Sequence, residues 1–106
     1  MKSSELLRLA KARIVRRQSV HVCVATAQAL KEHEIAIGSM NAPAVVQNLR
    51  SLFGKGSVST WLWENSKEYR QFFLSAQTVD ECRKALQAYR LRWIDWMIEG
   101  YERVGD

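Results

Sequence analysis

The segment with the most suggestive chemistry is Gly54-Lys55-Gly56-Ser57, where two glycines around a lysine suggest a phosphate-binding loop. A P-loop requires a glycine five residues before its Gly-Lys pair and a serine or threonine directly after the lysine. Leu49 and Gly56 occupy those positions here, and no predicted strand leads into the segment. Two glycines after a predicted helix are typical of a helix C-cap followed by a turn, and a backbone anion nest is the alternative.

Two histidines and two cysteines are the remaining candidates for metal binding or nucleophilic catalysis. Cys23 and Cys82 are far apart in the sequence and match no metal-binding spacing. His21 and His33 are twelve residues apart, whereas two ligands on one helix need a separation of about four. Cys23 falls on the apolar face of a predicted helix, where a thiol is shielded rather than activated. We therefore predict buried free thiols of a reducing cytosol, and no metal ion or cofactor.

Three carboxylates, those of Asp95, Glu99 and Glu102, share the polar face of the last predicted helix. Paired carboxylates perform acid–base chemistry only when burial shifts their pKa values. Lys84 and Arg92 lie on the same face, so the spacing predicts a solvated surface with salt bridges. We predict no catalytic residue, and we expect that the protein is not an enzyme.

The arginines near the C-terminus are more informative. Arg83 and Arg90 are seven residues apart at the edge of an apolar stripe, and Tyr101 lies beside them on a helical wheel. One interpretation is that each arginine packs its stem against the protein and keeps its head group in water. The other is that a guanidinium beside an aromatic surface grips an anion or a carboxylate of a partner.

Trp61 and Trp63 cannot both face inward on one short helix, because residues two apart diverge by about 200°. Either the short helix is buried on several sides, or one tryptophan is exposed as an interface residue. Trp93 and Trp96, on the last helix, are predicted to lie in the core.

Helices must position all of these residues, because the chain has one proline and no sustained strand pattern bounded by hairpin turns. One helical face of the second helix, containing Val20, Cys23, Val24, Ala27 and Leu30, is predicted to face the core. Thr78 and Glu81 form a capping box that begins the last helix. The predicted helices span residues 4–17, 19–33, 43–53, 58–64, 66–76 and 78–103.

The length of 106 residues suits one domain, 1–106, with one modest core. Hydrophobic residues make up 47% and charged residues 25% of the chain, which is typical of a globular protein rather than a disordered one. We predict an all-α fold, a compact bundle of five to six helices with the long C-terminal helix as its spine. No apolar run reaches the ~18 residues of a membrane span, so we expect a cytoplasmic protein that does not engage a membrane.

The charge is uneven along the chain. The formal net charge is +5, and the basic residues concentrate in the first seventeen positions, where Glu5 is the only acid. A basic patch attracts polyanions, above all nucleic acid. The residues that would contact phosphates are Arg8, Lys11, Arg13, Arg16 and Arg17.

Four short patterns follow one another along the chain: His21–Ala25, Leu49–Gly54, Ser59–Leu62 and Tyr89–Ile98. In this order they resemble a group of small proteins encoded by bacteriophages and prophages. The resemblance covers most of the chain, contains no catalytic signature and supplies no site residues. It implies a viral accessory protein in the host cell cytoplasm that acts by stoichiometric binding to host machinery.

The leading hypothesis is a phage-encoded, non-enzymatic binding protein that blocks or modulates a host protein, for example a defence or transcription component. A homodimer is compatible with this hypothesis. One alternative is a nucleic-acid-binding protein that uses the basic N-terminal helix. Another is a sponge for a small anionic nucleotide, bound by Arg83, Arg90 and Tyr101 in a groove between subunits. The predicted partner-binding residues are Trp61, Trp63, Arg83, Arg90 and Tyr101.

Overall fold

The computed structural model describes residues 1–16, 22–53, 64 and 66–105, and their regular structure is helical. This confirms the predicted all-α class and the long C-terminal helix. Five helices lie within these residues, and the predicted helix over 58–64 falls almost entirely outside them. The helices are α1 (Ser3–Val15), α2 (Val22–Glu32), α3 (Ala44–Phe53), α5 (Lys67–Leu74) and α6 (Val79–Arg103).

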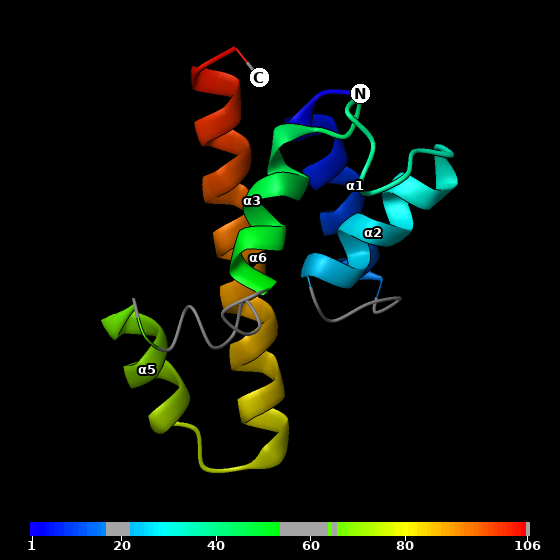
Figure 1. Ribbon diagram of the computed structural model, residues 1–106. Coiled ribbons are helices and arrows are strands. Elements are labelled where there is room, and N and C mark those ends of the chain that lie inside the picture. Colours follow the sequence, from blue (N-terminus) through cyan, green and yellow to red (C-terminus); the bar gives the residue numbers. More distant parts are fainter. Residues whose placement is uncertain (17–21, 54–63, 65, 106) are drawn as a thin grey trace.

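Helix α6 runs the length of the molecule, which measures 43 × 26 × 25 Å (Figure 1). At 1.5 Å per residue its 25 residues span about 37 Å. Helices α1, α2 and α3 gather around the C-terminal half of α6, while α5 lies beside the N-terminal half (Figure 1). Helix α1 packs against both α2 and α6 and is the central element of the larger group.

The capping box predicted at the start of α6 is present. The hydroxyl of Thr78 accepts a hydrogen bond from the backbone N–H of Glu81, at 3.1 Å. The carboxylate of Glu81 reaches back to accept from the N–H of Gln77, at 2.7 Å. The first bond satisfies an N–H group that has no partner inside the helix. The second ties the residue before the N-cap Thr78 to the first turn, so α6 begins at a defined residue.

The core is formed where α1, α2, α3 and the C-terminal half of α6 meet. Leu6 and Ile14 of α1 and Leu30 of α2 are fully buried, as is Ile94 of α6. All four are branched aliphatic side chains, which fill a helix–helix interface in few rotamers. The other buried hydrophobic residues are Leu7, Ala10, Val22, Cys23, Ala25, Ala29, Ala42, Val45, Val46, Leu49, Ala85, Tyr89, Trp93 and Ile98.

Candidate binding surfaces

An apolar groove lies along the outer face of α2 and has a volume of about 590 Å³. The turn after the helix forms its far wall, and apolar atoms make up nearly all of its lining. Val24 and Ile37 remain 47% and 42% exposed although both are large aliphatic residues. The groove is lined by Cys23, Val24, Ala27, Gln28, Lys31, Glu34, Ile35, Ala36 and Ile37.

The predicted apolar stripe of α2 is therefore divided between the core and this groove. Leu30 is fully buried and Cys23 nearly so, but Val24 is exposed and Ala27 half-buried. The prediction that Val24 faces the core is wrong, because α2 turns a different line of side chains inward, that of Val22, Cys23, Ala25, Thr26, Ala29 and Leu30. Periodicity shows that a helix is apolar over a wide arc, but the neighbouring helix decides which part of that arc is covered. Val20 lies outside the described residues.

Cys23 sits between the groove and the core. Burial raises the pKa of its thiol to about 11, although a backbone hydrogen bond and the nearby charge of Arg90 act in the opposite direction. At neutral pH the thiol is thus protonated, and it contributes an apolar, unreactive atom to the groove. Both cysteines are free, and Cys23 is buried as predicted. The prediction of burial is wrong for Cys82, which is half-buried.

A second exposed surface lies on the outer face of α6. Trp96 is 61% exposed, whereas Trp93, three residues earlier, is only 8% exposed. The prediction that Trp96 lies in the core is wrong, because the buried arc of α6 runs through Trp93, Arg90 and Ile94 and ends before it. Trp96 borders a hollow of about 300 Å³ whose other lining residues are Asn48, Met97, Gly100, Tyr101, Arg103 and Val104.

Tyr101 is the predicted partner-binding residue that lines this hollow. It is half-buried, and its hydroxyl accepts a hydrogen bond from the side-chain amide of Asn48, at 2.9 Å. The bond joins α3 to α6. Tyr101 thereby forms a fixed wall of the hollow with its ring packed against the core.

The two predicted arginines have different surroundings. Arg83 is exposed, but Arg90 is only 6% exposed and lies on the inner side of α6. The expectation that the head group of Arg90 lies in water is therefore wrong, because α6 turns this residue toward the core. Along the helix axis Arg83, Arg90 and Tyr101 are spaced by roughly 10 and 16 Å. Trp61 and Trp63 lie outside the described residues.

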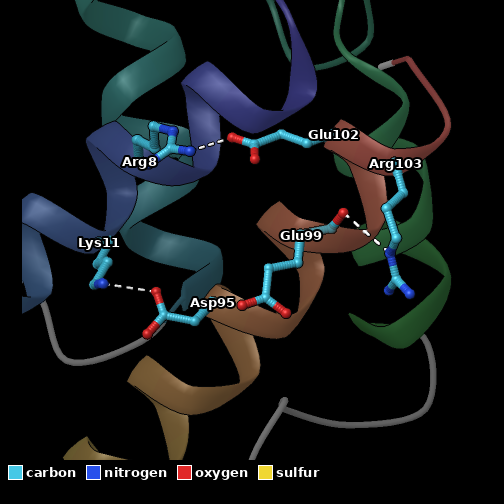
Figure 2. Close-up of polar contacts among 6 residues, drawn as sticks. All are labelled: Arg8, Lys11, Asp95, Glu99, Glu102 and Arg103. Carbon is cyan, nitrogen blue, oxygen red and sulfur yellow. Dashed lines mark hydrogen bonds and ion pairs between the residues drawn. The ribbon is translucent and has the colours of Figure 1, made fainter.

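The basic residues of α1 are engaged with acidic residues of the same chain. Lys11 binds Asp95 of α6 with its Nζ 2.6 Å from the carboxylate, and Arg8 binds Glu102, about two turns further along α6 (Figure 2). The carboxylate of Glu99 lies on the same side of α6 as that of Asp95 (Figure 2). Of the predicted salt-bridged face, Asp95 and Glu102 thus pair with α1, whereas Lys84, Arg92 and Glu99 are exposed beside them.

Arg13 turns to the opposite side of α1 and pairs with α2. It forms an ion pair with Glu32, and its guanidinium donates to the side-chain oxygen of Gln28, at 3.2 Å. Arg16 is exposed, and Arg17 lies outside the described residues. Three of the five cations predicted to contact phosphates therefore already face a carboxylate, and a nucleic acid would have to compete with these pairs.

Among the residues the structure describes, no three side chains of His, Cys, Asp or Glu gather as a metal site would require. Within the same ranges, no helix combines the length and the apolar character needed to cross a membrane. No family model matches the sequence, and comparisons with curated proteins and with solved structures find no match.

Proposed function

We propose that this chain is a phage-encoded, non-enzymatic binding protein that blocks or modulates a host protein in the cytoplasm of the host cell. The observation that carries the binding function is the apolar groove on α2. The viral origin and the host target rest on the resemblance of patterns such as Tyr89–Ile98 to phage accessory proteins. In this proposal the chain forms one domain, a bundle of five to six helices that includes the helix predicted over 58–64.

Helix α2 supports this function because it is apolar on two sides. Its inner side packs on α1, and its outer side leaves Val24 in contact with water, beside the exposed Ile37 of the following turn. Removing apolar surface from water contributes about 25 cal/mol per Å², so a partner that covers this groove is stabilised by burial. A contiguous apolar hollow beside a helix is the surface that receives the apolar face of a second helix.

The charges at the groove favour a protein over a nucleic acid. Lys31 and Glu34, one cation and one anion, are the charged residues of its lining. A phosphate backbone needs several unpaired cations along its path, whereas one charge of each sign fixes the direction of a bound helix. We expect the partner to present an amphipathic helix with an apolar stripe facing Val24 and Ile37.

The test is a pull-down of tagged protein from nuclease-treated host bacterial lysate at moderate salt, comparing wild type with Val24→Glu. One host protein recovered in near-equal amount by wild type, and at least tenfold less by Val24→Glu, supports the proposal. Val79→Glu is the matched control, because Val79 is also an exposed valine and lies at the start of α6, far from the groove. We expect Val79→Glu to recover the host protein as well as wild type does.

Equal recovery by Val24→Glu and wild type would contradict the groove as the contact surface. Retention of nucleic acid without nuclease, and of no protein after it, would favour the nucleic-acid alternative. The basic α1 would then be the element to substitute, beginning with the exposed Arg16.

A further inference from the structure

The outer face of α6 has a regular pattern of exposed residues that the groove on α2 does not involve. Ala88, Arg92, Trp96, Glu99 and Arg103 are all exposed. Their spacings of four, four, three and four place them within an arc of about 80° on the helix. Spacings of three and four residues are typical of a seam between two packed helices. We call these five residues the α6 seam.

The charged residues of the α6 seam contact only their own helix within the described part of the chain. The Nε of Arg103 donates to the backbone carbonyl of Glu99, at 3.4 Å. Asp95 and Glu102, beside the seam, are paired with α1, but Arg92 and Glu99 form no ion pair among the described residues. Arg92 stacks over the ring of Tyr89 at 5.7 Å, which holds its guanidinium close to the helix. One cation and one anion therefore flank Trp96 on an open surface.

A second copy of α6 that runs antiparallel to the first brings seam residues of opposite charge together. A two-fold axis between Asp95 and Trp96 places Arg92 opposite Glu99 of a second copy, and Glu99 opposite the second copy's Arg92. The same axis places the small Ala88 opposite the long Arg103. From this pattern we infer that the α6 seam is an interface between two copies of this chain, packed antiparallel.

The contact has the composition of a specific small interface. Trp96 and its counterpart meet at the axis, where a large aromatic side chain contributes most to binding. The two symmetric Arg92–Glu99 pairs fix the register and the antiparallel direction. The seam extends over about 22 Å, which gives an interface at the small end of specific contacts. The dimer therefore dissociates on dilution through the micromolar range.

This interface leaves the groove on α2 open. Helix α1 lies between α2 and α6 (Figure 1), and none of the residues that line the groove belongs to α6. The dimer thus presents two grooves, and its formation does not depend on what occupies them.

The test is sedimentation analysis of the full chain over a concentration series, with charge reversals at the seam. Arg92→Glu places only acids opposite each other, and Glu99→Arg places only arginines, so each variant alone is monomeric. An equimolar mixture of the two variants forms a heterodimer, because the acids of one face the arginines of the other. The double variant Arg92→Glu/Glu99→Arg restores the homodimer.

Two controls separate the interface from folding and from the groove. Arg83→Glu reverses an exposed charge on the opposite side of α6, nine residues before Arg92, and leaves the dimer intact, as does Val24→Glu. Circular dichroism confirms that all variants keep the helical content of wild type. A monomeric wild type at every concentration would overturn the inference. So would single variants that dimerise like wild type, or a mixture that remains monomeric.

Discussion

The outer faces of α2 and α6 are both exposed, but they differ in shape and in charge. The face of α2 is a concave groove with an apolar floor that includes Val24. The face of α6 is the outer surface of a rod on which Arg92 and Glu99 flank Trp96. An apolar floor recognises a partner by shape and by burial of area, and it tolerates different sequences. A charged seam recognises a pattern and rejects partners whose charges do not match.

Helix α1 explains why the two faces remain separate. Its cations pair with acids on both neighbours, with Asp95 of α6 on one side and with Glu32 of α2 on the other. These pairs neutralise the flanks that face α1, and the surfaces that face away keep the features available to partners.

The largest effect is expected where α6 faces the core. Ile94 is fully buried, and Ile94→Ala leaves a cavity that lowers the free energy of unfolding by about 2–5 kcal/mol. Trp96→Ala, on the outer face of the same helix, lowers it by less than about 1 kcal/mol, because the indole is already mostly in water. Urea denaturation of both variants measures the difference. A loss at Trp96 as large as that at Ile94 would mean that the outer face is structural.

The next effect concerns the apolar environment of the groove on α2. Because the pKa of Cys23 is about 11, its thiolate fraction at pH 8 is about a hundred times lower than that of an ordinary thiol. We expect correspondingly slow modification by a small thiol reagent, with a rate that rises about tenfold per pH unit up to pH 11. Labelling followed by mass spectrometry measures Cys23 separately from Cys82. Fast modification at pH 8 would show that the thiol is not shielded.

The raised pKa of the Cys23 thiol also makes the free energy of unfolding depend on pH. The folded protein holds the proton of Cys23 more tightly than the unfolded chain does, so this stabilisation is fully present below pH 9. It is lost as pH rises from about 9 toward 11. Thermal unfolding of wild type and Cys23→Ala over this range isolates the contribution, since other groups titrate equally in both. Parallel pH profiles for the two proteins would contradict it.

A smaller effect is expected at the beginning of α6. Thr78→Ala removes the side-chain acceptor for the N–H of Glu81 and lowers the free energy of unfolding by about 1 kcal/mol. Thr78→Ser keeps an acceptor and serves as the matched control. If Thr78→Ala has the same free energy of unfolding as wild type and Thr78→Ser, the cap does not stabilise α6.

The smallest effect is expected for the ion pairs of α1. Lys11 and Asp95 are 38% and 48% exposed in their side chains, and pairs of this kind contribute about 0.2–1 kcal/mol. A double-mutant cycle with Lys11→Ala and Asp95→Ala measures the coupling, which decreases further at high salt. A coupling of several kcal/mol would mean that α1 is held on α6 mainly by charge rather than by Leu7 and Ile14.

Local properties of the sequence determined the helices, the capping box at Thr78 and Glu81, and the burial of Trp93. Helix propensity, capping and apolar spacing act between residues a few positions apart, so they can be read from the chain. The free thiols and the absence of a P-loop motif at Gly54–Ser57 follow from the sequence in the same way.

Only the tertiary structure decided which side of each apolar arc is covered. Val24 and Trp96 satisfy the spacing of core residues, yet both are exposed, while the charged Arg90 is buried. Each of these residues lies within or at the edge of an apolar arc that is wider than one neighbouring helix covers. The positions of α1 and α3 around α6, and of α1 against α2, select the buried part. The exposed remainder became the groove on α2 and the α6 seam.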